Sequence, residues 1–428
     1  MSIGAVGGSM RRRRRNSFIM LWAGLLLIVG IVWVYGKLSG GSDPNGSGGG
    51  TPEPSLAPPV EQQPAAVAEK EEMIGIWVPF MALTTADKTE EAFKQNFDNI
   101  VRISREHGVN TLFVHVRPYC DALYRSSYYP WSHILTDTQG QDPGYDPLQY
   151  MVETAHENGM QIHAWINPLR VKTAATPAEL SADNPYSEMK GEYPYYFMEY
   201  EGAVYLNPAY PHVRTLIANG AVEIVKNYDV DGVHFDDYFY PTQEGTVDAE
   251  AYERYTQTTE VPVPLQMWRE ANINALVSEV YEKIKRQNGS VLFGISPSGN
   301  IGNNYKIGAD VKTWCAIDGY VDYICPQLYY SYDSETLSYT DALSQWLELP
   351  QHNNLDMIIG LALYKAGTDV DEGTWLVSSD IIKRQIEQAR EVDCAGVILY
   401  SSEYLEREET AKEVENAMAV ILPNREEE

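Results

Sequence analysis

The sequence predicts an α/β protein whose main domain is a (β/α)8 barrel, preceded by one transmembrane helix and a flexible linker. From Met73 onward, eight short runs rich in β-branched and aromatic residues alternate with longer amphipathic stretches. This alternation is typical of a parallel sheet with crossover helices. No G-x-G-x-x-G motif follows the first run, which disfavours an open dinucleotide-binding sheet. Eight strand–helix units in the remaining length therefore favour the barrel.

The predicted strands cover residues 75–80, 111–117, 161–167, 232–238, 291–297, 320–329, 357–364 and 396–400. The clearest predicted helices cover residues 90–107, 148–158, 212–228, 266–286, 380–391 and 411–421. Gly108, Gly159 and Asp231 stand where a helix is expected to end and the next strand to begin. Residues 171–205 and 241–264 are predicted to be long loops that follow strands, the part of a barrel where active sites are built.

The N-terminal segment predicts a membrane anchor. Residues 11–15 are five arginines, and residues 18–35 are uncharged and almost wholly apolar. Eighteen residues rising about 1.5 Å each can just cross a bilayer, with the arginine side in the cytoplasm. We therefore predict a basic cytoplasmic stub (1–16), a transmembrane anchor (17–36), a Gly/Ser/Pro-rich linker (37–72) and an extracellular catalytic domain (73–428) at the cell membrane. A cleaved signal peptide is the alternative, but the apolar run is long and no A-x-A site follows it.

Composition excludes several classes of protein. The 428 residues include 60 acidic and 32 basic ones, a net charge of -28, which disfavours nucleic-acid binding. The four cysteines form no CxxC, so neither a disulfide framework nor a zinc site is expected, and no cofactor is predicted. Tyr is abundant, at 30 residues against 9 Phe. Because Tyr has an apolar face and a polar tip, this excess predicts a wet, aromatic-lined surface.

The predicted catalytic carboxylates follow strands. The segment 231–240 places His234 and Asp236 on one face of an extended strand, and Asp237 begins the loop. Reactions in such barrels occur at the C-terminal ends of the strands. The alternative is that these carboxylates cap the next segment or pair with Arg117 or Arg170. The four predicted catalytic residues are Asp236, Asp237, Asp333 and Glu403.

Polar or aromatic side chains also end most of the other predicted strands, and an aromatic rim of this kind suits sugar rings. Arg117 and Asp121 could instead form a structural ion pair, and His234 could be a structural hydrogen-bond partner. The predicted substrate-binding residues are Trp77, His115, Arg117, Asp121, Tyr124, Trp165, Asn167, Asn207, His234, Tyr238, Ser296, Gln327, Tyr329 and Tyr364.

Several long stretches carry a family likeness, among them FVHVRPYCDALYRSSYYPWS (113–132), DGVHFDDYFYP (231–241) and VDYICPQLYYSYD (321–333). The chain resembles glycosyl hydrolase-like family 10, bacterial (β/α)8 proteins related to glycoside hydrolases. The resemblance implies hydrolysis of glycosidic bonds in a cell-wall polysaccharide, in particular peptidoglycan glycan strands. It places the family's acidic pair on Asp236 and Asp237. In chitinase-type barrels a Glu would stand where this chain has Tyr238, so that mechanism does not transfer directly.

Other interpretations remain open at this point. Glycoside hydrolysis usually needs two carboxyl groups, although a substrate's N-acetyl group can replace one of them. A second hypothesis is a non-catalytic, membrane-tethered glycan-binding barrel. A third is a metal-dependent hydrolase or deacetylase using His115, His163 and His234, disfavoured because no H-x-H or H-x-x-x-H spacing occurs.

Overall fold

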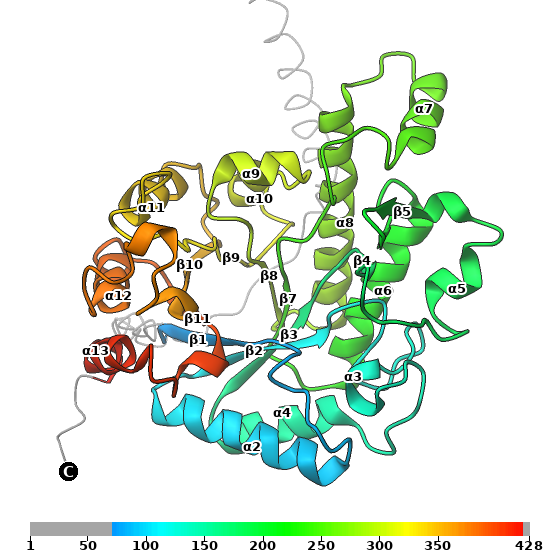
Figure 1. Cartoon of the computed structure of the whole chain (residues 1–428). Coiled ribbons are helices and arrows are strands. Elements are labelled where there is room, and N and C mark those ends of the chain that lie inside the picture. Colours follow the sequence, from blue (N-terminus) through cyan, green and yellow to red (C-terminus); the bar gives the residue numbers. More distant parts are fainter. Residues whose placement is uncertain (1–70, 423–428) are drawn as a thin grey trace, which may run out of the picture. The chain divides into compact units, whose positions relative to one another are not determined.

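Eight parallel strands close into a barrel in the computed structural model, which describes residues 71–422 (Figure 1). Around the barrel the strand order is β1-β11-β10-β9-β8-β7-β3-β2. Every one of the eight predicted strands contributes, so the predicted (β/α)8 barrel is confirmed. The strands are β1 (Met73–Val78), β2 (Thr111–Arg117), β3 (Gln161–Ile166), β7 (Gly232–Phe235), β8 (Leu292–Ile295), β9 (Tyr323–Ile324), β10 (Asp356–Leu361) and β11 (Gly396–Tyr400).

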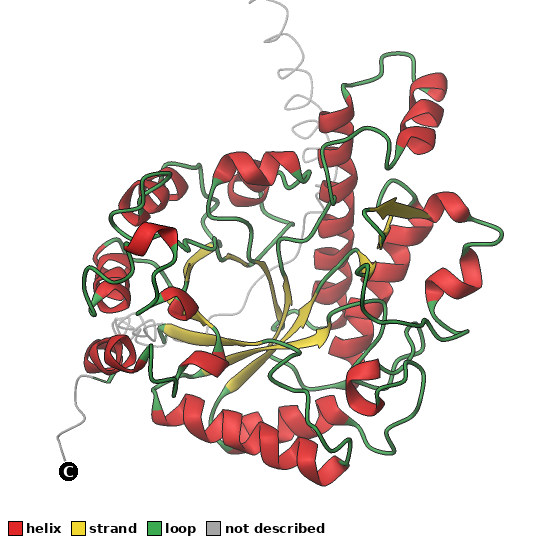
Figure 2. Cartoon of the chain, in the orientation of Figure 1, coloured by secondary structure: helices red, strands yellow, loops and turns green. Residues whose placement is uncertain are grey.

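Helices surround the barrel (Figure 2). The predicted ones are α2 (Glu90–Glu106), α4 (Pro147–Glu157), α6 (Pro211–Asn227), α8 (Leu265–Gln287), α12 (Ile381–Glu391) and α13 (Ala411–Ile421). Shorter helices complete the layer: α3 (His133–Thr136), α5 (Pro185–Met189), α7 (Ala249–Thr258), α9 (Ile301–Lys306), α10 (Val311–Ala316) and α11 (Tyr339–Leu347). Single 3₁₀ turns are η1 (Pro194–Tyr196), η2 (Leu363–Lys365), η3 (Asp371–Gly373) and η4 (Ser402–Tyr404).

Helix α2 shows why these sequences form helices. The Thr89 side chain accepts a hydrogen bond from the Ala92 N–H and caps the first turn. Phe93, Phe97 and Val101 recur at a spacing of four residues and are all buried against the barrel. After the helix, Gly108 takes a positive φ of 73°, as predicted for a residue that ends a helix. A Cβ at Gly108 would lie 2.7 Å from the Ile421 side chain, so space also requires glycine there.

The barrel interior is filled by large rings that face small residues. Its buried apolar cluster is Trp77, Phe113, Trp165, Tyr323, Cys325, Ile358 and Ile398. Two glycines on neighbouring strands make room for rings. A Cβ at Gly294 would lie 2.1 Å from the Tyr323 ring, and one at Gly232 would lie 2.4 Å from the His163 ring. The interior is therefore a packed core that supports the strand ends, as expected for this barrel.

The two predicted loops contain regular structure that was not predicted. Residues 170–206 form a three-stranded antiparallel sheet, here called the insert sheet, in the order β4 (Arg170–Lys172), β6 (Ala203–Leu206), β5 (Phe197–Tyr200). Glu201 and Gly202 both have positive φ (49° and 79°) and make the two-residue turn between β5 and β6. The other loop holds helix α7. Strand β9 is shorter than predicted at both ends. On its C-terminal side Pro326 has no N–H to donate, and pairing recurs only as isolated bridges at Gln327.

The predicted stub and anchor, with the linker up to residue 70, lie outside the described residues. Within residues 71–422 no helix has the length and apolar character needed to cross a membrane. Glu72, the last residue of the predicted linker, already belongs to the fold. Its carboxylate accepts hydrogen bonds from Arg390 at 2.8 and 2.7 Å, and its carbonyl accepts one from Asn110.

Candidate active site

Asp236 lies at the C-terminal end of β7, buried beneath the barrel mouth with 3% of its surface exposed. Its carboxylate accepts hydrogen bonds from Trp165 Nε1 at 3.0 Å, Asn167 Nδ2 at 3.2 Å and the Tyr238 backbone N–H at 3.2 Å. Trp165 and Asn167 are on and just after β3, the neighbouring strand. Alternation along β3 points both side chains the same way. The structure thus brings together four predicted site residues, Asp236, Trp165, Asn167 and Tyr238.

The ionisation of the acidic pair is perturbed. Burial raises the pKa of Asp236 to about 7; Arg170 opposes this rise and Asp237 adds to it. Burial also raises the pKa of Asp237, opposed by hydrogen bonds from its own backbone N–H and from the Gln327 side chain and by the charge of Arg170. A carboxyl group with a pKa near 7 keeps its proton at mildly acidic pH. Asp236 therefore has the properties of a general acid.

Arg170 is a charged residue of the site that was not among the predicted catalytic or substrate-binding residues. Its guanidinium carbon lies 4.9 Å from the Tyr119 ring centroid and 5.0 Å from that of Tyr238, so the cation contacts two aromatic rings. Its Nε donates to the Pro118 carbonyl at 3.1 Å. Its position in the sequence, three residues after Asn167, could have identified it. In the structure the Asn167 side-chain oxygen accepts a hydrogen bond from the Arg170 backbone N–H.

We expect Arg170→Gln to move the pH–activity profile to higher pH. Arg170 lowers the pKa of both Asp236 and Asp237, so its loss raises both. If activity needs one carboxyl group protonated and the other ionised, both the acidic and the alkaline limit of the pH–activity profile therefore move to higher pH. The measurement is kcat/KM against pH. Arg125→Gln, which removes a cation that contacts Trp131 instead, is the control and should leave the profile in place.

Four aromatic side chains pack together: they come from β1, from the loop after β9, from η2 and from the end of β11. The Trp77 ring centroid lies 6.4 Å from that of Tyr329 and 5.9 Å from that of Tyr400. Tyr364 lies 5.9 Å from Tyr329 and 5.7 Å from Tyr400. The structure brings together the predicted residues Trp77, Tyr329 and Tyr364, and it adds Tyr400, which was not predicted. These rings form a second wall of the candidate site, here called the aromatic wall.

His234 belongs to a hydrogen-bonded row inside the barrel. Its Nδ1 lies 3.0 Å from the Tyr323 hydroxyl, and its Nε2 lies 2.9 Å from Ser296 Oγ and accepts from Trp77 Nε1 at 3.4 Å. Because an indole N–H only donates, Nε2 is an acceptor and Nδ1 carries the proton. The imidazole is neutral, consistent with burial, which lowers the pKa of His234 well below its usual value. The structure therefore places His234 and Ser296 under the aromatic wall, with their polar atoms satisfied by protein.

His115 differs from His234. Its ring stacks on Trp165 with centroids 3.7 Å apart and an interplanar angle of 8°. The ring is buried, and neither nitrogen has a hydrogen-bond partner among the described residues. Burial first, then the charge of Arg170, lowers its pKa well below the usual value. The neutral His115 ring therefore packs against the Trp165 indole, whose N–H donates to Asp236.

Four predicted binding residues are buried in contacts that shape loops. Arg117 donates to the carbonyls of Asn167 and Pro168, and Tyr124 packs against Tyr228. Asp121 accepts from Gln139 and contacts His133 at 3.1 Å, so the structure does not form the predicted alternative of an Arg117–Asp121 ion pair. Asn207 donates to the Tyr195 carbonyl and accepts from the Ala209 N–H. Their predicted role in substrate binding stays a prediction.

The other predicted carboxylates differ in position. Asp333 is exposed in the loop after β9. Glu403 is half-buried in η4, near Tyr400 of the aromatic wall. Gln327 is half-buried, donates to the Ser296 carbonyl at 2.9 Å and bonds to Asp237. Among the candidates for a partner of Asp236, Asp237 is thus the one that shares its electrostatic environment.

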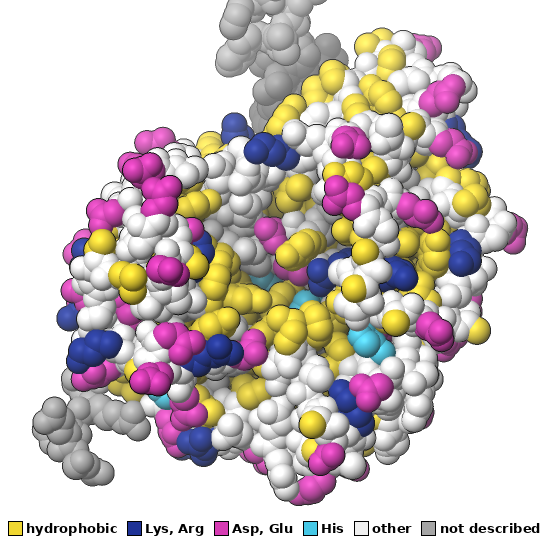
Figure 3. Space-filling model, in the orientation of Figure 1, with side chains coloured by type: hydrophobic (Ala, Val, Ile, Leu, Met, Phe, Trp, Pro, Cys, Tyr) yellow, Lys and Arg dark blue, Asp and Glu magenta, His cyan; other side chains and the backbone are white. Residues whose placement is uncertain are grey.

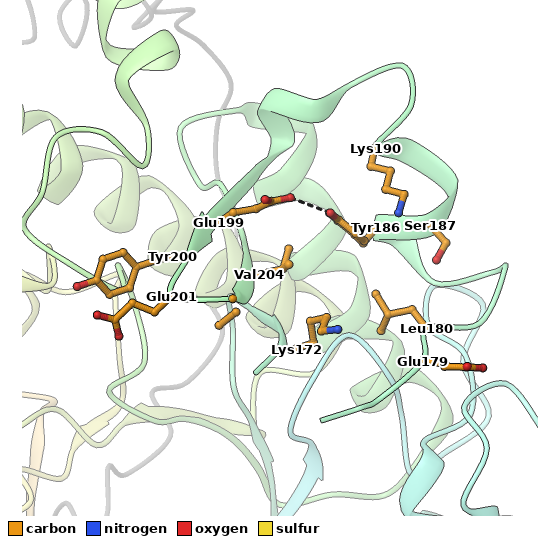
Figure 4. Close-up of a pocket in the computed structure, with 12 residues that line it drawn as sticks. Lys172, Glu179, Leu180, Tyr186, Ser187, Lys190, Glu199, Tyr200, Glu201 and Val204 are labelled. Atoms are coloured by element: carbon orange, nitrogen blue, oxygen red, sulfur yellow. Dashed lines mark hydrogen bonds between the residues drawn. The ribbon is translucent and has the colours of Figure 1, made fainter. Parts of the chain in front are cut away.

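Figure 3 shows the molecule in the orientation of Figure 1. In the middle of the face turned to the viewer is a hollow, with histidine and acidic side chains inside it and hydrophobic and basic side chains around it. A separate cavity of about 670 Å³ lies on the insert sheet (Figure 4). None of the residues around Asp236 lines it, and the perturbed carboxyl pair lies outside it. Within residues 71–422, no group of three or more His, Cys, Asp or Glu side chains is arranged to hold a metal ion.

The sequence is similar to one protein family and to several curated proteins. The sequence profile of the family described as glycosyl hydrolase-like 10 matches residues 72–377. Glycosyl hydrolase YngK of Bacillus subtilis is 34% identical over 70% of this chain, which spans only 61% of that relative. Glycosyl hydrolase DigH of Escherichia coli is 30% identical over 85% of this chain and 91% of its own length.

A similar fold occurs in the PgaB (BpsB) glycoside hydrolase domain from Bordetella bronchiseptica. The TM-score is 0.53 at 12% identity, over 81% of this chain and 99% of that domain. This likeness concerns the fold alone, whereas the family profile and the curated relatives match the sequence itself. The chain therefore belongs to the glycosyl hydrolase-like 10 family, and it is a glycoside hydrolase.

Proposed function

We propose that this glycoside hydrolase cleaves peptidoglycan glycan strands outside the cell, tethered to the membrane by its N-terminal segment. The observation that carries the proposal is the buried carboxyl pair: Asp236, with a pKa raised to about 7, beside Asp237 in the segment that resembles the family's acidic site. In this proposal protonated Asp236 donates a proton to the leaving glycosidic oxygen. Water supplies the oxygen that replaces the leaving group at the anomeric carbon and loses a proton in doing so. Asp237, held by Gln327, is the second carboxyl group, which assists this step as base or nucleophile.

The aromatic wall and Tyr238 support a carbohydrate substrate. Tyr238 exposes 53% of its surface beside Arg170, and Tyr329, Tyr364 and Tyr400 are half-buried. Rings with one face accessible and a polar tip suit sugars, which present both apolar C–H faces and hydroxyls. Peptidoglycan as the polymer rests on the family resemblance, and the tether rests on the arginine-flanked apolar run at residues 11–35.

The test is incubation of the full chain with purified peptidoglycan, with and without its stem peptides, followed by mass analysis of soluble products. New reducing-end sugars are expected, and Asp236→Asn should release none above background. Glycan that stays intact while the protein remains bound to it would contradict the proposal and favour a binding protein. Expression of the chain with and without residues 1–37, followed by membrane fractionation, tests the tether; loss of membrane association is expected on truncation.

A further inference from the structure

The insert sheet carries aromatic side chains on the face that begins at the active site. The register pairs Arg170 of β4 with Tyr205 of β6, and Tyr205 with Met198 of β5. Side chains alternate along a strand, and directly opposed residues share a face. Tyr200, two residues after Met198, therefore lies on the same face as Tyr205 and Arg170. Arg170 is also the residue that contacts Tyr238 and lowers the pKa of Asp236.

The opposite face of the sheet has a different composition and its own contacts. Lys172, Glu199 and Val204 lie there, and the Tyr186 hydroxyl donates to Glu199 at 2.8 Å. Figure 4 shows Tyr200 pointing away from Tyr186 and Lys190. The two faces are thus distinct. The cavity of about 670 Å³ with its mixed charges lies mainly on this opposite face, although Tyr200 and Glu201 at the hairpin tip also border it. The other face continues from the catalytic residues.

We propose that the Arg170–Tyr205–Tyr200 face of the insert sheet is a distal binding surface for the glycan chain, extending the cleft beyond the sugars next to Asp236 and Asp237. This inference rests on the proposed function. Tyr205 and Tyr200 are diagonal neighbours, roughly 7–8 Å apart between backbones, so their rings offer successive contacts along an extended polymer. Both are half-buried, which leaves part of each ring accessible.

The surface also has suitable electrostatics for a neutral or anionic chain. Burial raises the pKa of Tyr205, Arg170 opposes the rise, and Glu201 and Tyr200 add to it, consistent with the row of neighbours that the register gives. Arg170 is the cation of this row. The hydroxyls of Tyr200 and Tyr205 make no hydrogen bond within residues 71–422, so they can exchange hydrogen bonds with sugar hydroxyls. A chain that reaches the tip of the β5–β6 hairpin gains contacts that a short fragment does not.

The experiment compares Tyr200→Ala with wild type on long glycan strands and on short oligosaccharides cut from the same strands. We expect KM for long strands to rise roughly 3- to 10-fold, the range for one lost ring contact. The kcat value and the rates on short fragments should stay unchanged. Tyr186→Ala is the matched control, because it removes a ring from the opposite face of the same sheet, and it should leave both substrates unaffected.

Two results would overturn the inference: an unchanged KM for long strands in Tyr200→Ala, or an equal loss on long and short substrates. If the wild type releases no product from any glycan, the proposed function fails. Co-sedimentation with insoluble peptidoglycan then decides the inference separately. Weaker retention of Tyr200→Ala than of Tyr186→Ala supports the distal surface, and equal retention of both with wild type contradicts it.

Discussion

Asp236→Asn should reduce kcat on glycan strands roughly 10²- to 10⁴-fold, the contribution of a positioned proton donor. The asparagine side chain has the volume of aspartate, and its oxygen can still accept from Trp165 and Asn167, as the aspartate does. Its NH2 group faces the Tyr238 N–H, so only that one hydrogen bond is lost. What catalysis loses is the transferable proton. Steady-state cleavage rates of the two proteins at pH 6 measure the effect.

The pH dependence of stability separates this effect from misfolding. Burial raises the pKa of Asp236 from 3.8 to about 7, so the folded protein holds this proton more tightly than the unfolded chain. The wild-type carboxyl therefore costs increasing stability as pH rises from about 4 to about 7. Asparagine has no such cost. The Tm of Asp236→Asn relative to wild type should improve between pH 5 and pH 8, whereas a misfolded variant would have a lower Tm throughout.

Neighbouring carboxylates provide the comparison. Asp237→Asn should lose activity to a similar degree, because Asp237 shares the buried environment of Asp236. Asp333→Asn should cleave at the wild-type rate, since its carboxylate is exposed in the loop after β9. Full activity in Asp236→Asn, or a large loss in Asp333→Asn alone, would move the proton donor elsewhere.

The barrel was predictable because its signals are local. Each strand is a short apolar run, and a helix-ending residue such as Gly108 marks the boundary before it. The position of Asp236 was predictable for the same reason, because alternation along one strand and the polarity of the barrel locate its side chain. The partners Trp165 and Asn167 follow from the same alternation on the next strand.

The features that were missed depend on contacts between distant segments. Strand β4 has only three residues and pairs with β6 across more than thirty residues, so no local pattern announces the insert sheet. The sequence offered Arg170 only as a possible partner of the carboxylates. Its place beside them depends on Tyr119 and Tyr238, from two other loops, which contact its guanidinium. For His234 the sequence left a structural and a substrate-binding role open, because its hydrogen-bond partners Tyr323 and Trp77 come from other strands of the barrel.

Arg269→Met should destabilise the protein by about 3–5 kcal/mol, the usual cost of removing one partner of a buried ion pair. Arg269 of α8 donates through Nη2 and Nε to the Asp248 carboxylate at 2.6 and 2.8 Å, and both side chains are fully buried. It also donates to the Thr242 and Glu244 carbonyls. Chemical denaturation of wild type and variant measures the loss.

A double variant apportions this loss. Arg269→Met with Asp248→Leu removes both charges, so the penalty of an unpaired buried carboxylate disappears and the double variant should be more stable than Arg269→Met alone. The carbonyls of Thr242 and Glu244 stay unpaired and retain part of the cost. Arg254→Met is the control from the same loop. Its partner Glu250 is exposed, and such surface pairs contribute only about 0–1 kcal/mol.

The Arg269–Asp248 ion pair should also affect catalysis, because it holds the loop that directly follows Asp236 and Asp237 in the sequence. Arg269 lies 4.9 Å from the Tyr240 ring, four residues after Asp236, and bonds to the backbone from Thr242 to Glu244. Releasing that segment should allow the Tyr238 N–H to leave Asp236 and should lower kcat even at temperatures where the barrel stays folded. Hydrogen exchange over residues 238–248, faster in Arg269→Met than in Arg254→Met, would connect the two losses. Equal exchange with reduced activity would place the cause outside the loop.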